Sequence, residues 1–261
     1  MRTLSLVGPD ATDLAARLAA ALDDRVVTVE RLPDGGAGPA PEAAAAYGLG
    51  ADGSWVGAGG DRSLDGLLDD LVPDHDVALL AGFPDAAAPA VALGDADPAG
   101  EVLVRARTAE AALPEARDAV ERVEPRVTLA SLVRRAKASP RADRAGAVAT
   151  FTGRVRARDD PDDPRTLRLE FEKYDGVADE RLAAIREDLR ARDGVHEVLL
   201  HHRTGVVEAG EDIVFVVVLA GHREEAFRTV EDGINRLKAE VPLFKKETTV
   251  EDDFWVHERD R

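Results

Sequence analysis

The order of the expected strands and helices constrains the fold of this chain most, because that order changes part-way along the sequence. In the first part, an apolar run at 4–7 predicts a strand, and Leu14, Leu18 and Leu22 share one face of a following helix. Apolar runs at 26–29 and 77–81 predict two more strands, the second of them buried. Strands that alternate with helices favour parallel pairing, so we expect an α/β domain with a parallel sheet.

The later part of the chain has a different order, in which strands follow one another directly. Strands are expected at 146–155, 166–171, 198–207 and 213–219. Two helices with apolar side chains at helical spacing are expected at 178–189 and 227–241, and Pro242 ends the second. This mixture predicts an α+β domain.

A segment with two prolines and many charges, residues 113–125, is the expected linker between the two domains. The domains are therefore expected at 1–112 and 126–261. Their charges differ: residues 1–112 hold 19 acidic and 7 basic side chains, whereas residues 113–261 hold 32 and 27. This asymmetry indicates two separate units.

The formal net charge of −17 argues against binding to nucleic acid, because a phosphate backbone would be repelled. No apolar run is long enough for a membrane helix, and residues 1–8 lack the features of a signal peptide, so we expect a cytoplasmic protein. The chain has no cysteine, which excludes disulfides, thiolate metal sites and iron–sulfur clusters. No histidine spacing indicates a metal site, and none is expected.

Lysine is scarce, with five lysines against 29 arginines. Many aspartates and few lysines are typical of halophilic proteins, so we expect a halophilic source. Three of the lysines, Lys238, Lys245 and Lys246, lie within nine residues. A solvated helix end accounts for Lys238. The alternative is a functional role, because a lysine near other cations can pass protons or form a covalent adduct.

Two further groups of cations are candidates for binding an anion. His222 and Arg223 stand where a strand ends and a helix begins, a position that favours phosphate. Arg154 and Arg156 point to the same side of an expected strand and could grip an anion together. The alternatives are a surface turn for the first pair and a charged edge strand for the second.

The turn at 8–13 occupies the place of a phosphate-binding P-loop, but it lacks that motif's second glycine and its lysine. Asp10 and Asp13 would repel a nucleotide. We therefore expect a degenerate version of a nucleotide-binding domain.

Several motifs together resemble the catalytic (large) subunit family of molybdopterin synthase over about 126–261. In order they are GAVATFTGRVR at 146–156, LEFEKY at 169–174, HRTG at 202–205, GHREEAF at 221–227 and RLKAEVPLFKKE at 236–247. Their order and spacing are specific as a set, although no single motif is.

The resemblance implies an α/β hammerhead-type domain, normally a homodimer that forms a heterotetramer. The substrate would be cyclic pyranopterin monophosphate, and the product the dithiolene of molybdopterin. The sulfur would come from the C-terminal Gly-Gly thiocarboxylate of a small ubiquitin-like partner subunit, with no bound cofactor. Lys238 and Lys245 match the family's catalytic lysines, although Lys245 could instead hold the partner's carboxy terminus. The matching substrate-binding positions are Arg154, Val155, Arg156, His222, Arg223, Lys246 and Glu247.

Residues 1–112 resemble more weakly the adaptor protein family of molybdopterin-guanine dinucleotide biosynthesis. The motifs that carry this resemblance are LSLVG at 4–8, DVALLAGF at 76–83 and VALGD at 91–95. It implies a degenerate adaptor module that docks partners of the same pathway. A non-catalytic scaffold and a GTP-dependent adaptor remain the alternative functions for the whole chain.

Overall fold

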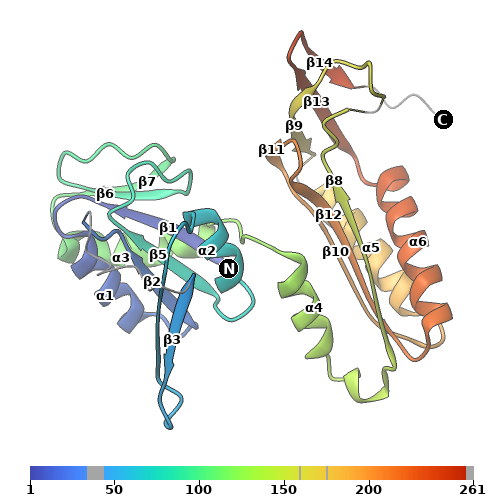
Figure 1. The fold of residues 1–261 in the computed structure, drawn as a ribbon, viewed down its shortest axis with the longest axis horizontal. Helices are drawn as coiled ribbons and strands as arrows, with labels where there is room; N and C mark the ends of the chain where they lie inside the picture. The colour runs from blue at the N-terminus through green and yellow to red at the C-terminus, as the bar shows by residue number, and fades with distance from the viewer. Residues whose placement is uncertain (34–43, 159, 175, 257–261) are drawn as a thin grey trace. The chain divides into compact units, whose positions relative to one another are not determined.

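The computed structural model describes residues 1–33, 44–158, 160–174 and 176–256 of the chain (Figure 1). They form two compact units, Met1–Thr128 and Leu129–Arg261, and each unit has its own core. In the described residues, no helix is both long enough and apolar enough to cross a membrane.

The first unit is built on a five-stranded sheet whose strands all run parallel, as the alternation of strands and helices predicted. Their order is β2-β5-β1-β6-β7. The strands are β1 (Arg2–Val7), β2 (Val26–Glu30), β5 (Val77–Ala81), β6 (Ala90–Leu93) and β7 (Val102–Ala106).

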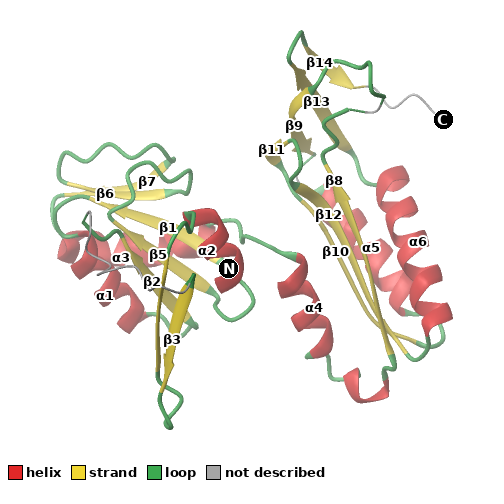
Figure 2. Ribbon diagram, viewed as in Figure 1, coloured by secondary structure: helices red, strands yellow, loops and turns green. Residues whose placement is uncertain are grey.

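Helices bury both faces of this parallel sheet, which is why its central strands are almost wholly apolar. Helices α1 (Ala11–Ala21) and α3 (Ala109–Arg122) pack on the face that carries Leu4, Leu6 and Leu79. Helix α2 (Leu64–Leu71) packs on the opposite face, against Ala78 and Leu80 (Figure 2).

The prediction of a linker at 113–125 is wrong for most of that segment. Residues 109–122 form α3, which begins at Thr108 with a side-chain cap and contains Pro114 in its second turn. Its buried face consists of alanines, with Ala112, Ala116 and Ala119 fully inaccessible. Since alanine offers little apolar surface, the segment resembled a charged connector, and the boundary between units falls at 128/129 instead.

A two-stranded hairpin, β3 (Ala45–Leu49) with β4 (Trp55–Gly59), is inserted between β2 and α2. Every residue in its two strands is exposed, including Tyr47, Leu49 and Trp55. The sequence analysis did not predict this hairpin.

The second unit combines two antiparallel sheets with helices, as the predicted α+β order requires (Figure 2). One sheet has the order β10-β12-β8 and the other β11-β9-β13-β14. The strands are β8 (Ala147–Arg154), β9 (Thr166–Lys173), β10 (Val195–His202), β11 (Gly205–Glu208), β12 (Asp212–Ala220), β13 (Leu243–Thr249) and β14 (Asp253–Val256).

Helices α5 (Val177–Arg190) and α6 (Arg223–Glu240) cover one face of the three-stranded sheet. Alternate residues of β12, among them Val214, Val216 and Val218, form the core beneath these helices. Helix α4 (Leu129–Lys137), which precedes the short 3-10 helix Ala142–Arg144, packs against β10 and β12. Neither of these two segments was predicted.

Candidate functional site

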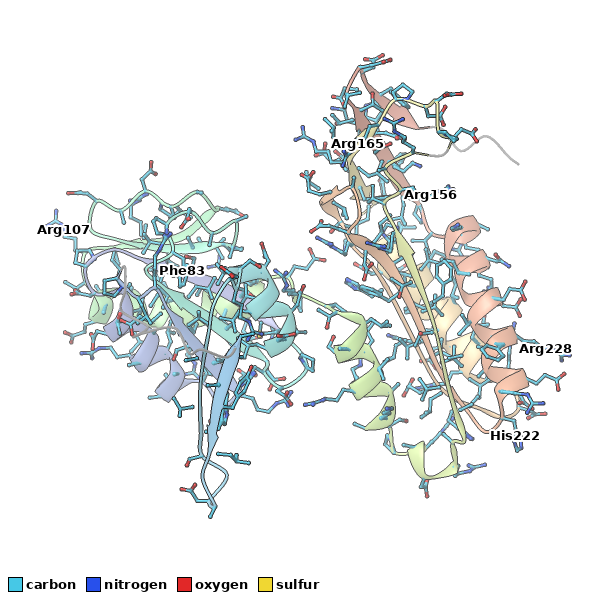
Figure 3. All side chains as sticks on the ribbon, in the orientation of Figure 1. Phe83, Arg107, Arg156, Arg165, His222 and Arg228 are labelled. Carbon is cyan, nitrogen blue, oxygen red and sulfur yellow. The ribbon has the colours of Figure 1, made fainter. Side chains whose placement is uncertain are left out.

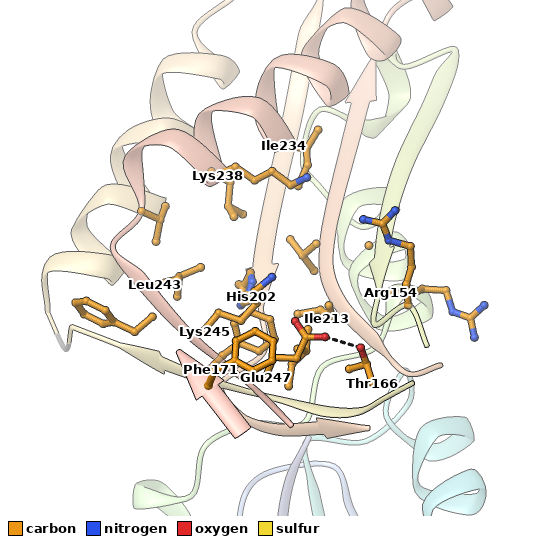
Figure 4. A pocket seen from close by; sticks show the side chains of 18 of the residues that line it. Arg154, Thr166, Phe171, His202, Ile213, Ile234, Lys238, Leu243, Lys245 and Glu247 are labelled. Atoms are coloured by element: carbon orange, nitrogen blue, oxygen red, sulfur yellow. Dashed lines mark hydrogen bonds between the residues drawn. The ribbon is translucent and has the colours of Figure 1, made fainter. Parts of the chain in front are cut away.

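A cavity of about 860 Å³ lies inside the second unit, where the last turn of α6, the end of β8 and the strands β9 and β13 come together (Figure 4). Four cationic side chains line it, in a chain whose net charge is −17. They are Arg154, Arg156, Lys238 and Lys245. The cavity is the candidate functional site.

Lys238 reaches the cavity because α6 is held at a fixed rotation against the sheet. The helix buries Val230, Ile234 and Leu237, and Gly233 lets it approach β12 closely: a Cβ there would meet Val216 at 3.0 Å. Lys238 follows the last of these core residues and lies in the final turn of the helix, where the helix dipole favours a positive charge. Val241 and Pro242 then lead directly into β13.

Strand β13 divides its polar residues between two faces. Lys245 and Glu247 line the cavity, on the same side as Phe171 and Leu169 opposite them on β9. The Glu247 carboxylate accepts a hydrogen bond from the hydroxyl of buried Thr166. Alternation along a strand therefore delivers one lysine and one carboxylate to the same wall.

Lys246 was predicted to bind substrate but does not line the cavity. Its ammonium lies 2.5 Å from the Asp253 carboxylate of β14, and this hydrogen bond raises the pKa of Lys246. The side chain points to the opposite face of the strand from Lys245, as the two-residue period of a strand requires.

Arg154 and Arg156 both line the cavity, as their spacing predicted. Nε of Arg154 donates to the Gly210 carbonyl at 3.1 Å and lies 3.3 Å from the Asp212 carboxylate. Val155 between them is 2% exposed and packs in a small core, so its side chain is absent from the cavity wall. Its backbone pairs with Glu211 and Gly210, which fixes the direction of both arginines.

His202 also lines the cavity, at the end of β10. Its Nδ1 lies 2.7 Å from the Arg203 carbonyl oxygen, and its ring meets the Phe171 ring edge to face at 4.8 Å. Burial lowers the pKa of His202, although the hydrogen bond to Arg203 opposes that shift. The neighbouring His201 stacks on Phe215, and burial lowers its pKa to about 4.

His222 and Arg223 are not brought to this cavity within one chain. His222 is the N-cap of α6, and both residues are exposed. Lys238 lies about four turns further along the helix, which places it roughly 22 Å away along the axis. Figure 3 shows His222 and Arg156 at opposite ends of the second unit. Within one chain, this pair therefore lies apart from the cations that line the cavity.

Among the cavity-wall residues that the sequence did not predict are His202 and Thr166. The two-residue period of a strand allows only one of His201 and His202 to face a given site. Which of the two faces it depends on the register between β10 and β12, and a single strand does not reveal that register. In the described parts of the chain, no group of three or more His, Asp or Glu side chains could hold a metal ion.

Comparison with known proteins connects this site to a family. The sequence model of the MoaE protein family matches residues 123–240. A protein of Haloferax volcanii named probable molybdopterin synthase is 61% identical over 262 residues, covering 99% of this chain and all of that protein. The molybdopterin synthase catalytic subunit of Yersinia pestis is 40% identical over 118 residues, 45% of this chain and 77% of that protein.

Solved structures give matches of the same kind. The crystal structure of molybdopterin synthase from Staphylococcus aureus shares 32% identity, with a TM-score of 0.42, over 44% of this chain and 83% of that one. A complex of subunits 1 and 2 of molybdopterin-converting factor from Helicobacter pylori shares 21% identity, with a TM-score of 0.43, over 51% and 86%. Because the Haloferax relative matches along its whole length, this chain belongs to the molybdopterin synthase family and is a sulfurtransferase of molybdenum cofactor biosynthesis.

Proposed function

We propose that this chain is the catalytic subunit that converts cyclic pyranopterin monophosphate into molybdopterin. Sulfur is transferred to the pterin from the thiocarboxylated C-terminal glycine of a small ubiquitin-like subunit, and this forms the dithiolene. The proposal needs no resident metal or cofactor. One observation carries it: four cations, from the end of β8, from α6 and from β13, line one cavity of a chain with net charge −17.

The cavity suits a phosphorylated small molecule in size and in charge. Its volume of about 860 Å³ lies within the range of ligand sites in proteins. The guanidinium groups of Arg154 and Arg156 can bind phosphate oxygens in pairs, which a lysine does less well. Leu169 and Phe171 supply an apolar wall for the pterin rings.

We assign proton transfer to Lys238 and Lys245. Opening the cyclic phosphate leaves a negative oxygen that must be protonated, and an ammonium group at the cavity wall can supply that proton. Glu247, held by Thr166, orients Lys245 or the substrate from the same strand. Lys245 is also placed to bind the carboxy terminus of the partner subunit.

The chain needs a partner and a second copy in this proposal. The relatives named catalytic subunit imply another subunit, and a cysteine-free chain must receive its sulfur from outside. His222 and Arg223 can bind substrate only if a second copy brings the start of its α6 to this cavity. We therefore propose a homodimer that binds two small subunits.

Complementation between two inactive variants tests the shared site. Mixed dimers of His222→Ala and Lys238→Ala contain one cavity with both residues intact if the site is shared between copies. Activity should then return on mixing. No recovery in dimers shown to have exchanged subunits would place His222 outside the site.

For the first unit we propose a docking module without nucleotide hydrolysis. Its strands lie on both sides of β1, and α/β proteins with this kind of strand order commonly bind nucleotides at the carboxyl ends of the strands. The turn after β1 lacks the residues for that task, so GTP should not bind. Saturable GTP binding to the full chain would contradict this part of the proposal.

Reconstitution tests the proposed activity. The purified chain is incubated with thiocarboxylated small subunit and cyclic pyranopterin monophosphate, and molybdopterin is detected by mass spectrometry. We expect one dithiolene for every two thiocarboxylates consumed. If the small subunit binds without any sulfur reaching the pterin, the chain is a scaffold and the proposal is wrong.

A further inference from the structure

The imidazole of His202 is a part of the cavity wall that none of the roles above uses. It stands at the carboxyl end of β10, beside Phe171 of β9. The edge-to-face contact with Phe171, at 4.8 Å between ring centres, holds the plane of the imidazole. Its orientation is therefore fixed on one side by packing.

A hydrogen bond fixes which nitrogen of His202 carries the proton. A carbonyl oxygen can only accept, so Nδ1, at 2.7 Å from the Arg203 oxygen, must be the donor. That carbonyl is itself immobilised, because the Arg203 N–H donates to Ile213 at 2.8 Å and its guanidinium donates to the Asp212 carbonyl at 3.0 Å. In the neutral ring, Nε2 is left with a free lone pair.

Burial and nearby charges both act on the pKa of this ring. Burial lowers the pKa of His202 from its ordinary value. Four cations and four carboxylates line the same cavity, so their effects on the charge of the ring oppose each other. They are Lys238 of α6, Lys245 and Glu247 of β13, Arg154 and Arg156 at the end of β8, and Asp163, Glu251 and Asp252 of the loops.

The proposed function creates a step that needs such a base. Once the thiocarboxylate sulfur has bonded to the pterin, the partner's terminal carbonyl and the pterin are joined through that sulfur as a thioester. Water must form a C–O bond to the carbonyl carbon while the C–S bond breaks. The bonding electron pair stays on sulfur as a thiolate, and water must give up one proton.

We propose that Nε2 of His202 accepts that proton and so acts as the general base that releases sulfur from the partner subunit. The released carboxylic acid loses its remaining proton to solvent. The imidazolium also releases its proton to solvent before the second sulfur arrives. This inference rests on the proposed function, and it gives the lysines and the histidine opposite tasks. The lysines donate protons to the substrate, and His202 removes one from water.

The test compares His202→Gln with His201→Gln. The two residues are neighbours on one strand, but His201 stacks on Phe215 and does not line the cavity. We expect turnover of His202→Gln to fall by about 10²- to 10⁴-fold, the usual contribution of a general base. The partner–pterin thioester should accumulate and appear as a covalent adduct in intact-mass spectra. The His201 variant should turn over without the adduct.

Partial recovery of the His202→Gln rate with added imidazole or at higher pH would support the role, because a solution base then replaces the missing ring. Undiminished turnover of this variant, or a slow reaction without any adduct, would overturn it. If the wild-type chain itself forms no molybdopterin under the same conditions, the proposed function fails instead. The two failures are therefore distinguishable.

A measurement on the wild-type chain covers the case in which the variant does not fold. Nitrogen NMR of the histidine rings, assigned through backbone resonances, should show His202 with a proton on Nδ1 and none on Nε2 near pH 7.5. A proton on Nε2 at that pH, in either the neutral or the charged ring, would refute the assignment.

Discussion

The two units of this chain differ at the ends of their strands. In the first unit the turn after β1 is closed: Gly8 has φ of +129°, and a Cβ there would lie 2.3 Å from the Leu93 carbonyl oxygen at the end of β6. In the second unit the strand ends near α6 leave a cavity of about 860 Å³.

This difference shows that a suitable strand order and suitable side chains are separate requirements for a binding site. The first unit has the strand order in which ligands commonly bind at the carboxyl edge, yet its loop is closed and carries Asp10 and Asp13. The second unit has a cavity, and Lys238, Lys245 and two arginines line it. Four experiments test this difference between the two units.

The largest effect is expected for Lys238→Ala. Removing the ammonium takes away a proton donor, so turnover in the reconstituted reaction should fall about 10³-fold. Lys137→Ala, a lysine at the end of α4 away from the cavity wall, is the matched control and should keep full activity. Equal losses in both variants would show that lysine charge, rather than position, matters.

The next effect concerns the closed turn. Gly8→Ala should destabilise the first unit by about 3 kcal/mol, because an L side chain is strained at this φ and meets backbone atoms. Denaturant unfolding of the full chain measures the change. Gly60→Ala, with nothing within 4 Å of its Cβ, should change stability by less than about 0.5 kcal/mol. A stable Gly8→Ala variant would mean that the turn can open.

A smaller effect is expected for Arg156→Ala. Loss of one phosphate contact should raise KM for the cyclic pterin about 10- to 100-fold, equivalent to about 1.4–2.7 kcal/mol, with kcat changed less. Arg158→Ala, an exposed arginine two residues further on that donates to the Pro161 carbonyl, provides the comparison. A change in kcat alone would indicate that Arg156 acts in the chemical step and not in substrate binding.

The smallest effect is a pH-dependent one in the first unit. The side-chain hydrogen bond from Arg25 lowers the pKa of Asp76 to about 2. A carboxyl with a depressed pKa adds stability above its unfolded pKa, and that stability is lost as the pH falls through about 2. Asp76→Asn should therefore cost about 1 kcal/mol at pH 7, a value reduced for solvent screening because the side chain is 41% exposed.

The cost of Asp76→Asn should shrink between pH 4 and pH 2, which unfolding measurements across this range can follow. Asp23→Asn, an exposed aspartate nearby, controls for the removal of one negative charge. If the loss of stability caused by Asp76→Asn stays constant with pH, the effect comes from packing and not from the charge of the carboxylate.

Apolar periodicity predicted the helices and strands that bury large side chains. Ala178, Ile185 and Leu189 are buried in α5 at the expected spacing, and α6 ends before Pro242 as expected. Phe227 was placed in the core by the same spacing, but it is 65% exposed. The pattern defines a helical face but does not set how far the neighbouring sheet extends beneath it.

Two of the elements that sequence missed lack large buried side chains. Helix α3 packs through alanines, and the β3–β4 hairpin exposes all of its strand residues, so neither has the contrast that a periodic pattern needs. In the site, the shared side of Arg154 and Arg156 followed from local spacing, whereas Lys245 was indicated by the cluster of lysines and by the family resemblance. The partner of Glu247 and the outward turn of Lys246 required strand pairing across distant segments.

Helix α6 carries candidate groups at both of its ends, His222 before the first turn and Lys238 in the last. Between them it is a rigid spacer, and each inserted or deleted residue would rotate one end by about 100° relative to the other. Loops of this protein can therefore lengthen or shorten in evolution, whereas α6 can change only by whole pairs of turns, about seven residues, without misdirecting one of its termini. In the proposed function, the chemistry at both ends therefore fixes the length of this helix.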